Sequence, residues 1–222
     1  MWNLDLGQTK IRDIYFASSN SNKYVEIEPI LRQYGIVSHF AKLSLQEIQS
    51  ESVQQIAEAK CTNAFEHLQK PVIIEDDGFY ISSLKGFPGQ YSSFVSKTLG
   101  NQGILKLMQN RADRKAYFLS VIAYGDGHTF KIFSGKTHGK LSKLATDGGW
   151  GFDPIFVPEN TIKTYGELSL LNRKSFYSHR HKSIKKFSKW YIKKPLRYRN
   201  RCYCGKSNDY QSQNRISCRR RR

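Results

Sequence analysis

The acidic run Glu75-Asp76-Asp77-Gly78 is the first feature of this sequence that could do chemistry. It directly follows the apolar segment Val72-Ile73-Ile74, so we expect it where a buried strand ends, the place where open α/β sheets form their binding clefts. With Glu47, these carboxylates are hard oxygen ligands of the kind that hold Mg²⁺ while substrate phosphates and water complete the coordination. The alternative is a run of solvated surface acids.

A lysine falls on the apolar face of a predicted helix. Lys60 lies four residues after Ile56 and four before Ala64. A charge there costs free energy unless the side chain snorkels to water or meets an anion. The spacing alone leaves both possibilities open.

Two further groups could recognise a purine nucleotide. Trp150-Gly151-Phe152-Asp153 would combine an aromatic platform with a hydrogen-bonding end, although glycine-rich aromatic loops also occur as simple packing turns. Ser178-His179-Arg180 offers donors for a purine 6-oxo group or a phosphate, and alternatively caps a basic helix. No nucleophile elbow marks a Ser/His/Asp triad.

The first of the elements that must position these groups is an apolar strand, Ile14-Tyr15-Phe16-Ala17. It enters the polar segment Ser18-Ser19-Asn20-Ser21-Asn22, after which Val25, Ile27, Ile30 and Leu31 recur with helical spacing. The N-terminus of such a helix offers unpaired N–H groups and a favourable dipole to a phosphate. The pattern therefore predicts a strand, a polar phosphate loop and a helix.

The remaining pattern is typical of an α/β protein. A second helix is predicted from the N-cap Ser52 through Leu68. Strands are predicted at 116–124 and 129–134, joined by Gly125-Asp126-Gly127, and at 155–157 after a glycine-rich loop. A turn at 86–89, a helix at 103–108 and a basic amphipathic helix ending near Ile192 complete the expected elements.

The composition favours one globular domain in a reducing cytoplasm. The chain has 222 residues, 39% of them hydrophobic, and no stretch of about 18 apolar residues. Its first residues do not form a secretory signal. Cys61 stands alone, and the three other cysteines lie far downstream, so we expect no disulfide framework.

The net charge of +18 suggests a nucleic-acid-binding protein, but much of it lies in one segment. Residues 193–222 hold eleven Lys or Arg and one Asp, a net +10, which leaves +8 for the first 192 residues. This segment has no sustained periodicity, and its three cysteines without a histidine cannot complete a four-ligand zinc site. We predict an N-terminal extension (1–13), a catalytic domain (14–192) and a disordered basic tail (193–222) that binds nucleic acid weakly and nonspecifically.

In the order of these motifs the chain resembles the inosine triphosphate pyrophosphatase family, particularly its archaeal members, over about residues 14–191. Ser18-Ser19-Asn20-Ser21-Asn22-Lys23 is similar to the family's threonine-glycine-asparagine phosphate loop and its closing lysine. Glu47-Ile48-Gln49, Lys60 and Glu75-Asp76-Asp77-Gly78 resemble its metal-binding, lysine and acidic motifs. Further matches are the turn Gly86-Phe87-Pro88-Gly89-Gln90-Tyr91-Ser92, the loop Trp150-Gly151-Phe152-Asp153-Pro154, and Lys174 with Ser178-His179-Arg180.

The resemblance implies a two-lobed α/β fold around a long, mixed, twisted sheet, with a nucleotide in the central cleft and a homodimer as the assembly. It implies hydrolysis of ITP, dITP and XTP to the monophosphate and pyrophosphate. Glu47 and Asp76 would hold Mg²⁺, and Asp76 would be catalytic. The implied substrate-binding residues are Ser18, Ser19, Asn20, Ser21, Asn22, Lys23, Lys60, Asp77, Trp150, Gly151, Phe152, Asp153, Lys174, His179 and Arg180.

Four positions depart from the family pattern. Ser18 and Ser19 replace the usual first two residues of the phosphate loop. Asp77 replaces a common serine, and Ser93 stands where some members have a lysine that makes a phosphate or dimer contact. A pseudoenzyme that binds nucleotide without turnover is therefore one alternative. The others are a related pyrophosphatase acting on modified pyrimidine triphosphates or dUTP, and a basic nucleic-acid-binding protein.

Overall fold

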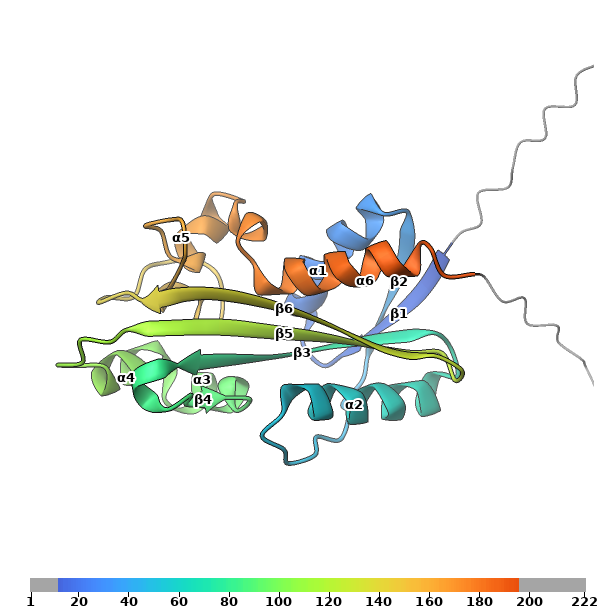
Figure 1. Cartoon of the computed structure of the whole chain (residues 1–222), viewed down its shortest axis with the longest axis horizontal. Coiled ribbons are helices and arrows are strands. Elements are labelled where there is room, and N and C mark those ends of the chain that lie inside the picture. The colour runs from blue at the N-terminus through green and yellow to red at the C-terminus, as the bar shows by residue number, and fades with distance from the viewer. Residues whose placement is uncertain (1–11, 196–222) are drawn as a thin grey trace, which may run out of the picture.

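Three long strands run the length of the molecule and carry both of its lobes (Figure 1). They are β3 (Val72–Ile81), β5 (Lys115–Gly125) and β6 (Phe130–Leu141). The structure, a computed structural model, describes residues 12–195. The predictions made for residues 1–11 and 196–222 lie outside this range.

The described residues form a seven-stranded mixed sheet in the order β2-β1-β3-β5-β6-β7, with β4 paired to β3. The shorter strands are β1 (Arg12–Ser18), β2 (Ile36–Lys42), β4 (Pro88–Gly89) and β7 (Phe156–Pro158). The helices are α1 (Ser21–Gln33), α2 (Val53–Leu68), α3 (Ser92–Thr98), α4 (Gly100–Leu107), α5 (Tyr165–Leu170) and α6 (His179–Tyr191). Three 3-10 turns are η1 (Ser82–Leu84), η2 (Asp153–Ile155) and η3 (Lys174–Phe176).

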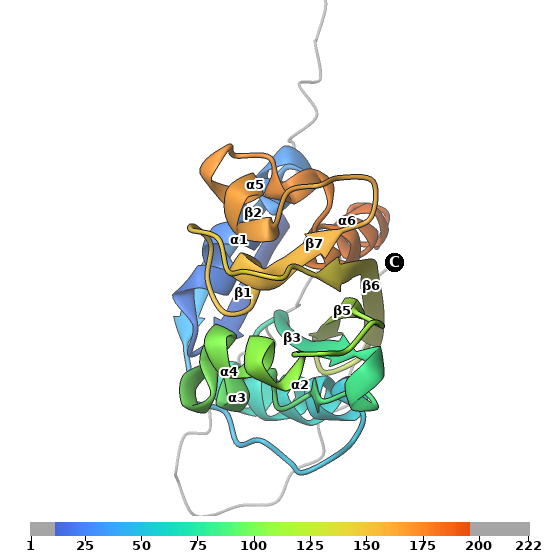
Figure 2. The same cartoon turned by 90° about the vertical axis from the view of Figure 1, so that its left-hand side faces the viewer.

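Helices cover both faces of the sheet because successive strand residues point to opposite sides. Ile73 packs in a cluster with α1 and α6, whereas the next residue, Ile74, packs with α2 on the other face. A third cluster fills the other lobe, where residues of α3, α4, β7 and α5 pack together with β3 and β5 (Figures 1 and 2). These layers confirm the α/β class expected from the sequence.

Local capping explains where the main helices begin. Ser52 accepts a hydrogen bond from Gln55 N at the start of α2, as its N-cap position predicted. Ser178 caps α6 by accepting from His181 N. No helix within residues 12–195 is long and apolar enough to cross a membrane.

Some predicted elements differ from the observed ones. Val25 was placed on the apolar face of its helix, but it is 68% exposed. The polar loop is shorter than predicted because α1 begins at Ser21. β1 begins at Arg12, and Lys194 bonds to Tyr124 Oη at 2.8 Å and pairs with Asp126. Domain contacts therefore extend on both sides of the predicted range 14–192.

The largest correction concerns the acidic run. It was predicted at the end of a strand, but Glu75, Asp76 and Asp77 lie in the middle of the ten-residue strand β3. The apolar run stops at Ile74, yet pairing with β5 continues from Val72 to Ile81. Extended pairing on one edge thus keeps polar residues in the strand, which hydrophobicity alone did not indicate.

Candidate active site

The candidate site lies in a gap along one edge of β3. That edge pairs with β1 only at Val72 and Ile73, and with β4 only at Phe79 and Tyr80. The opposite edge pairs with β5 throughout. Residues 74–78 therefore face an opening between the lobes, and a cavity of about 560 Å³ lies there.

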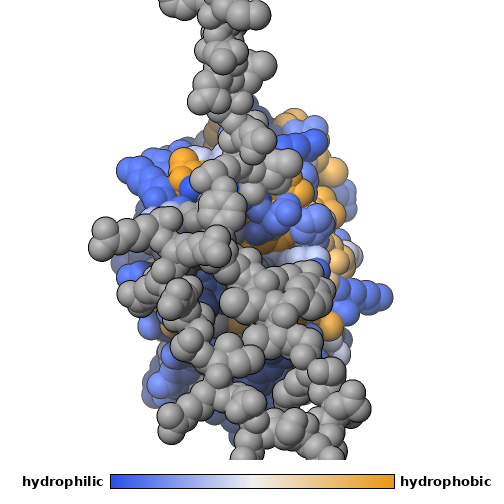
Figure 3. All heavy atoms as spheres, turned by 90° about the vertical axis from the view of Figure 1, so that its right-hand side faces the viewer, coloured by the Kyte–Doolittle hydropathy of each residue, from blue (hydrophilic) through white to orange (hydrophobic). Residues whose placement is uncertain are grey.

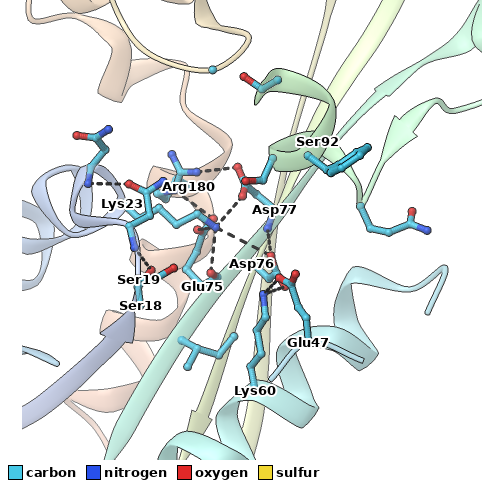
Figure 4. A pocket seen from close by; sticks show the side chains of 18 of the residues that line it. Ser18, Ser19, Lys23, Glu47, Lys60, Glu75, Asp76, Asp77, Ser92 and Arg180 are labelled. Atoms are coloured by element: carbon cyan, nitrogen blue, oxygen red, sulfur yellow. Dashed lines mark hydrogen bonds and ion pairs between the residues drawn. The ribbon is translucent and has the colours of Figure 1, made fainter. Parts of the chain in front are cut away.

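Strand alternation separates the three carboxylates of the acidic run. Glu75 and Asp77 point toward α1 and α6, where they meet Lys23 and Arg180 (Figure 4). Asp76 points to the other face, toward α2. The run therefore contributes to two clusters, one on each face, and Lys23 links them because its Nζ also lies 4.0 Å from Asp76 Oδ1.

Lys23 and Arg180 hold the first cluster together. Lys23 Nζ lies 3.0 Å from Glu75 Oε2 and 2.7 Å from Asp77 Oδ1. Arg180 Nε lies 3.1 Å from Glu75 Oε1, and its Nη2 lies 2.8 Å from Asp77 Oδ2. Although burial alone would raise the pKa of Asp77, Lys23 and Arg180 hold that pKa well below its usual value. Asp77 is thus an ionised structural partner of both cations.

The second cluster joins Asp76 to Lys60 and Glu47. Lys60 Nζ donates to Asp76 Oδ2 at 2.9 Å and also to Glu47 Oε1, in the loop between β2 and α2. Lys60 therefore meets anions, which decides between the two readings that its helical position allowed. Burial raises the pKa of Asp76, against the opposing effect of Lys23 and Lys60. A carboxylate with a raised pKa is a better proton acceptor.

Sequence reasoning missed Glu26, which holds together the cavity wall formed by Trp150 and Arg180. Its Oε1 accepts from Lys174 Nζ at 2.7 Å and from Trp150 Nε1 at 2.9 Å, and its Oε2 accepts from Arg180 Nη1 at 2.6 Å. Burial would raise the pKa of Glu26, but Arg180 and Lys174 lower it to about 2. The signal in the sequence was its position one helical turn after Lys23.

We predict that Glu26 makes the protein more stable at neutral than at acidic pH. Its folded pKa, about 2, lies below the ordinary value of 4.5. The stabilisation is therefore present above about pH 4.5 and is lost as the pH falls toward 2. The shift corresponds to about 3 kcal/mol at neutral pH.

Urea unfolding of wild type and Glu26→Gln at several pH values tests this prediction. The difference in unfolding free energy between the two proteins should shrink between pH 5 and pH 3. A Glu28→Gln variant, two residues further along α1 and paired with the exposed Arg32, is the control. A Glu26→Gln difference that stays constant over this range would contradict the linkage.

The loop that carries Trp150 is held by Asp153. Trp150 N donates to Asp153 Oδ2 at 3.1 Å, and Lys174 Nζ donates to the same oxygen at 2.6 Å. Gly149 has φ +68°, and a Cβ there would lie 2.5 Å from Asp153 Oδ2, so only glycine lets the backbone wrap this carboxylate. Asn101, in α4, also holds the loop, because its Nδ2 donates to Gly151 O at 3.0 Å.

The two aromatic residues of this loop have different surroundings. Phe152 is 3% exposed, and its ring lies 5.1 Å from that of Phe79 in the hydrophobic core. Trp150 has Arg180 Cζ 5.0 Å from its ring centroid. The Trp150 ring therefore lies against Arg180 at the cavity, whereas the Phe152 ring packs in the core beneath the cavity wall. The role of Trp150 as an aromatic platform stays a prediction.

The structure brings together nearly all residues that the resemblance assigned to the site. Ser18, Ser19, Asn20, Asn22, Lys23, Glu47, Lys60, Asp76, Asp77, Trp150, Gly151, Phe152, Asp153, His179 and Arg180 line the cavity. Ser21 and Lys174 do not line it; Lys174 lies behind the cavity wall, against Glu26 and Asp153.

His179 is 2% exposed and stacks on Phe118, and burial lowers its pKa. Its ring is therefore neutral at pH 7.

The donor set fits a magnesium ion. Glu47 and Asp76 both pair with the Lys60 ammonium, so an oxygen of each carboxylate already lies close to the same positive charge. No group of three or more His, Cys, Asp or Glu positioned for a metal occurs within residues 12–195. Mg²⁺ is commonly held by one or two carboxylates, with substrate phosphates and water as its other ligands.

The family model described as the Ham1 family matches residues 14–190. The chain belongs to the Ham1 family. It is 43% identical over 188 residues to a dITP/XTP pyrophosphatase of Pyrococcus horikoshii, covering 83% of this chain and 99% of that protein. It is 41% identical over 180 residues to the dITP/XTP pyrophosphatase of Methanopyrus kandleri, covering 80% and 95% of the two chains.

Solved Ham1 structures share this fold. The Staphylococcus aureus Ham1 protein superposes with a TM-score of 0.70 at 26% identity, over 82% of this chain and 99% of that chain. A HAM1 protein from Coxiella burnetii gives 0.71 at 25% identity, over 83% and 100%. These matches confirm the family and fold class expected from the sequence motifs.

Proposed function

We propose that this Ham1 protein hydrolyses nonstandard purine nucleoside triphosphates (ITP, dITP and XTP) to the monophosphate and pyrophosphate. The observation that carries the proposal is the gap in strand pairing along one edge of β3. In the cavity at this gap, the carboxylates Asp76 and Glu47 lie toward α2, and Lys23 and Arg180 lie toward α1 and α6. The loop that carries Trp150 lines the same cavity. The archaeal relatives named dITP/XTP pyrophosphatases support this substrate class.

In the proposed reaction, Asp76 accepts a proton from a water molecule that attacks the α-phosphorus. The bond from the α-phosphorus to the bridging oxygen breaks, and pyrophosphate leaves with its electron pair. Lys23 and Lys60 lie on either side of Asp76 and offset negative charge that develops on the phosphates. A Mg²⁺ ion at Glu47 and Asp76 would supply charge stabilisation and phosphate orientation.

Base selection is proposed to depend on Arg180. Its guanidinium donates hydrogen bonds and cannot accept one, so it can pair with the 6-oxo group of a purine but not with the 6-amino group of adenine. Glu26, Glu75 and Asp77 fix its guanidinium plane. Trp150 and the buried, neutral His179 complete this end of the cavity.

A pyrophosphate-release assay across ITP, XTP, dUTP, GTP and ATP, with and without Mg²⁺, tests the function. We expect metal-dependent cleavage of ITP and XTP. Preference for dUTP would favour the pyrimidine alternative, and binding without turnover would indicate a pseudoenzyme.

Replacing Trp150 with Ala should weaken nucleotide binding by roughly 1–3 kcal/mol, the usual value of a base–aromatic contact, and so raise KM for ITP. Trp150→Phe is the matched variant, because it keeps a smaller aromatic face and lacks the Nε1 bond to Glu26. Steady-state kinetics with ITP measure both. Unchanged KM and kcat in the Ala variant would make Trp150 a packing residue.

We further propose a cytoplasmic homodimer whose basic C-terminal segment binds nucleic acid weakly. At the end of the molecule where α6 stops, the coloured surface in view mixes hydrophilic and hydrophobic areas (Figure 3). Light scattering of the purified protein tests the dimer.

A chain ending at Pro195 should fold and turn over ITP with a kcat similar to that of the full chain. It should lose salt-sensitive nucleic-acid binding, because the removed residues carry most of the segment's positive charge. A second chain ending at Ile192 also loses Lys194 and its bonds to Tyr124 and Asp126, and should melt at a lower temperature. Loss of turnover in the Pro195 chain would make the segment structural or catalytic.

A further inference from the structure

The cations that line the cavity differ in whether they are already neutralised. Lys23 pairs with Glu75 and Asp77, and Lys60 pairs with Asp76 and Glu47. Arg180 is buried against three carboxylates. An incoming phosphate must compete with these carboxylates for each of the three.

Lys97 is different. It lines the same cavity from α3, it is exposed, and no carboxylate within residues 12–195 lies within ion-pair distance of it. Ser93, Ser96 and Lys97 are spaced i, i+3 and i+4, so they share one face of α3, and all three line the cavity. Val95 lies between them in sequence and is buried in the core, so its packing fixes the rotation of α3 that places these three residues at the cavity.

We propose that Lys97 binds the pyrophosphate end of the substrate. The proposal rests on the proposed function and names the residue that meets the leaving group. The free ammonium gives up no carboxylate on binding, and its long side chain can reach into the cavity. The hydroxyls of Ser93 and Ser96 are further donors on the same face of α3.

A purely structural role is the competing explanation. Lys97 lies in the last turn of α3, where a cation interacts favourably with the helix dipole. That role predicts a lower melting temperature in Lys97→Ala, with unchanged binding of phosphate ligands.

Inhibition of ITP hydrolysis by pyrophosphate and by IMP separates these roles. In Lys97→Ala, the inhibition constant for pyrophosphate should rise about tenfold, as for loss of one charged hydrogen bond, while that for IMP stays unchanged. Lys106→Ala, which removes an exposed lysine of α4 outside the cavity, is the control for net charge. Lys97→Ala combined with Ser93→Lys moves the ammonium one turn along the same face and should recover most of the pyrophosphate affinity.

The results are distinguishable from failure of the proposed function. If wild type does not hydrolyse ITP, calorimetric titration of wild type and Lys97→Ala with pyrophosphate still measures the subsite. Equal pyrophosphate affinity in wild type and Lys97→Ala, by either method, would overturn the role of Lys97. An equal loss of affinity in Lys106→Ala would also overturn it, because the effect would then be general electrostatics.

Discussion

An Asp76→Asn protein is expected to retain its fold and to lose at least about a hundredfold in kcat for ITP, the usual order for removing a central acid–base or metal-associated group. Asn keeps the size of the side chain but cannot accept the proton from water. It also removes the negative charge shared with Glu47 around Lys60. Both proposed roles of Asp76, as base and as metal ligand, are lost together.

The measurement is kcat with saturating ITP at several Mg²⁺ concentrations, with thermal melting to verify folding. Asp113→Asn removes an exposed carboxylate outside the cavity and should leave turnover near that of wild type. If added Mg²⁺ restores part of the activity of Asp76→Asn, the lost ligand contributes more than the lost base. Turnover of Asp76→Asn close to wild type would remove Asp76 from the mechanism.

The fold class was predictable because apolar periodicity and capping residues act locally. The segment from Ser52 to Leu68 carries its own N-cap and apolar face, and α2 spans Val53–Leu68. The middle of β3 was not predictable in this way, because Asp76 and Asp77 remain in the strand through pairing with β5, more than forty residues later in the chain. A hydrophobic pattern contains no information about such a partner.

The candidate site likewise has features that the sequence predicts and others that depend on contacts between distant residues. Motif order predicted residues that largely share one cavity, but it did not indicate which residues face which. Alternation along β3 turns Asp77 toward Arg180 and Asp76 toward Lys60, and only the structure shows this separation. Glu26 was missed because its role depends on contacts with Lys174 and Arg180, each more than 140 positions away in sequence.

Substrate selection should fail when Arg180 is replaced by lysine, even though the charge is kept. The guanidinium presents separate N–H groups to Glu26, Glu75 and Asp77, and a single ammonium cannot reproduce this planar arrangement. We expect kcat/KM for ITP to fall about a hundredfold, from loss of a charged hydrogen bond to the base, while the low kcat/KM for ATP changes little.

The decisive quantity is the ratio of ITP to ATP cleavage measured within each protein. This ratio is independent of the folded fraction, which matters because Arg180 is 1% exposed and its replacement lowers stability. Lys182→Ala, on the same helix with its Nζ bonded to Lys136 O, is the control and should preserve the ratio. Equal activity of wild type on ATP and ITP would refute base reading altogether. An unchanged ratio in Arg180→Lys would instead assign selectivity to Trp150 and His179, because these side chains line the same end of the cavity.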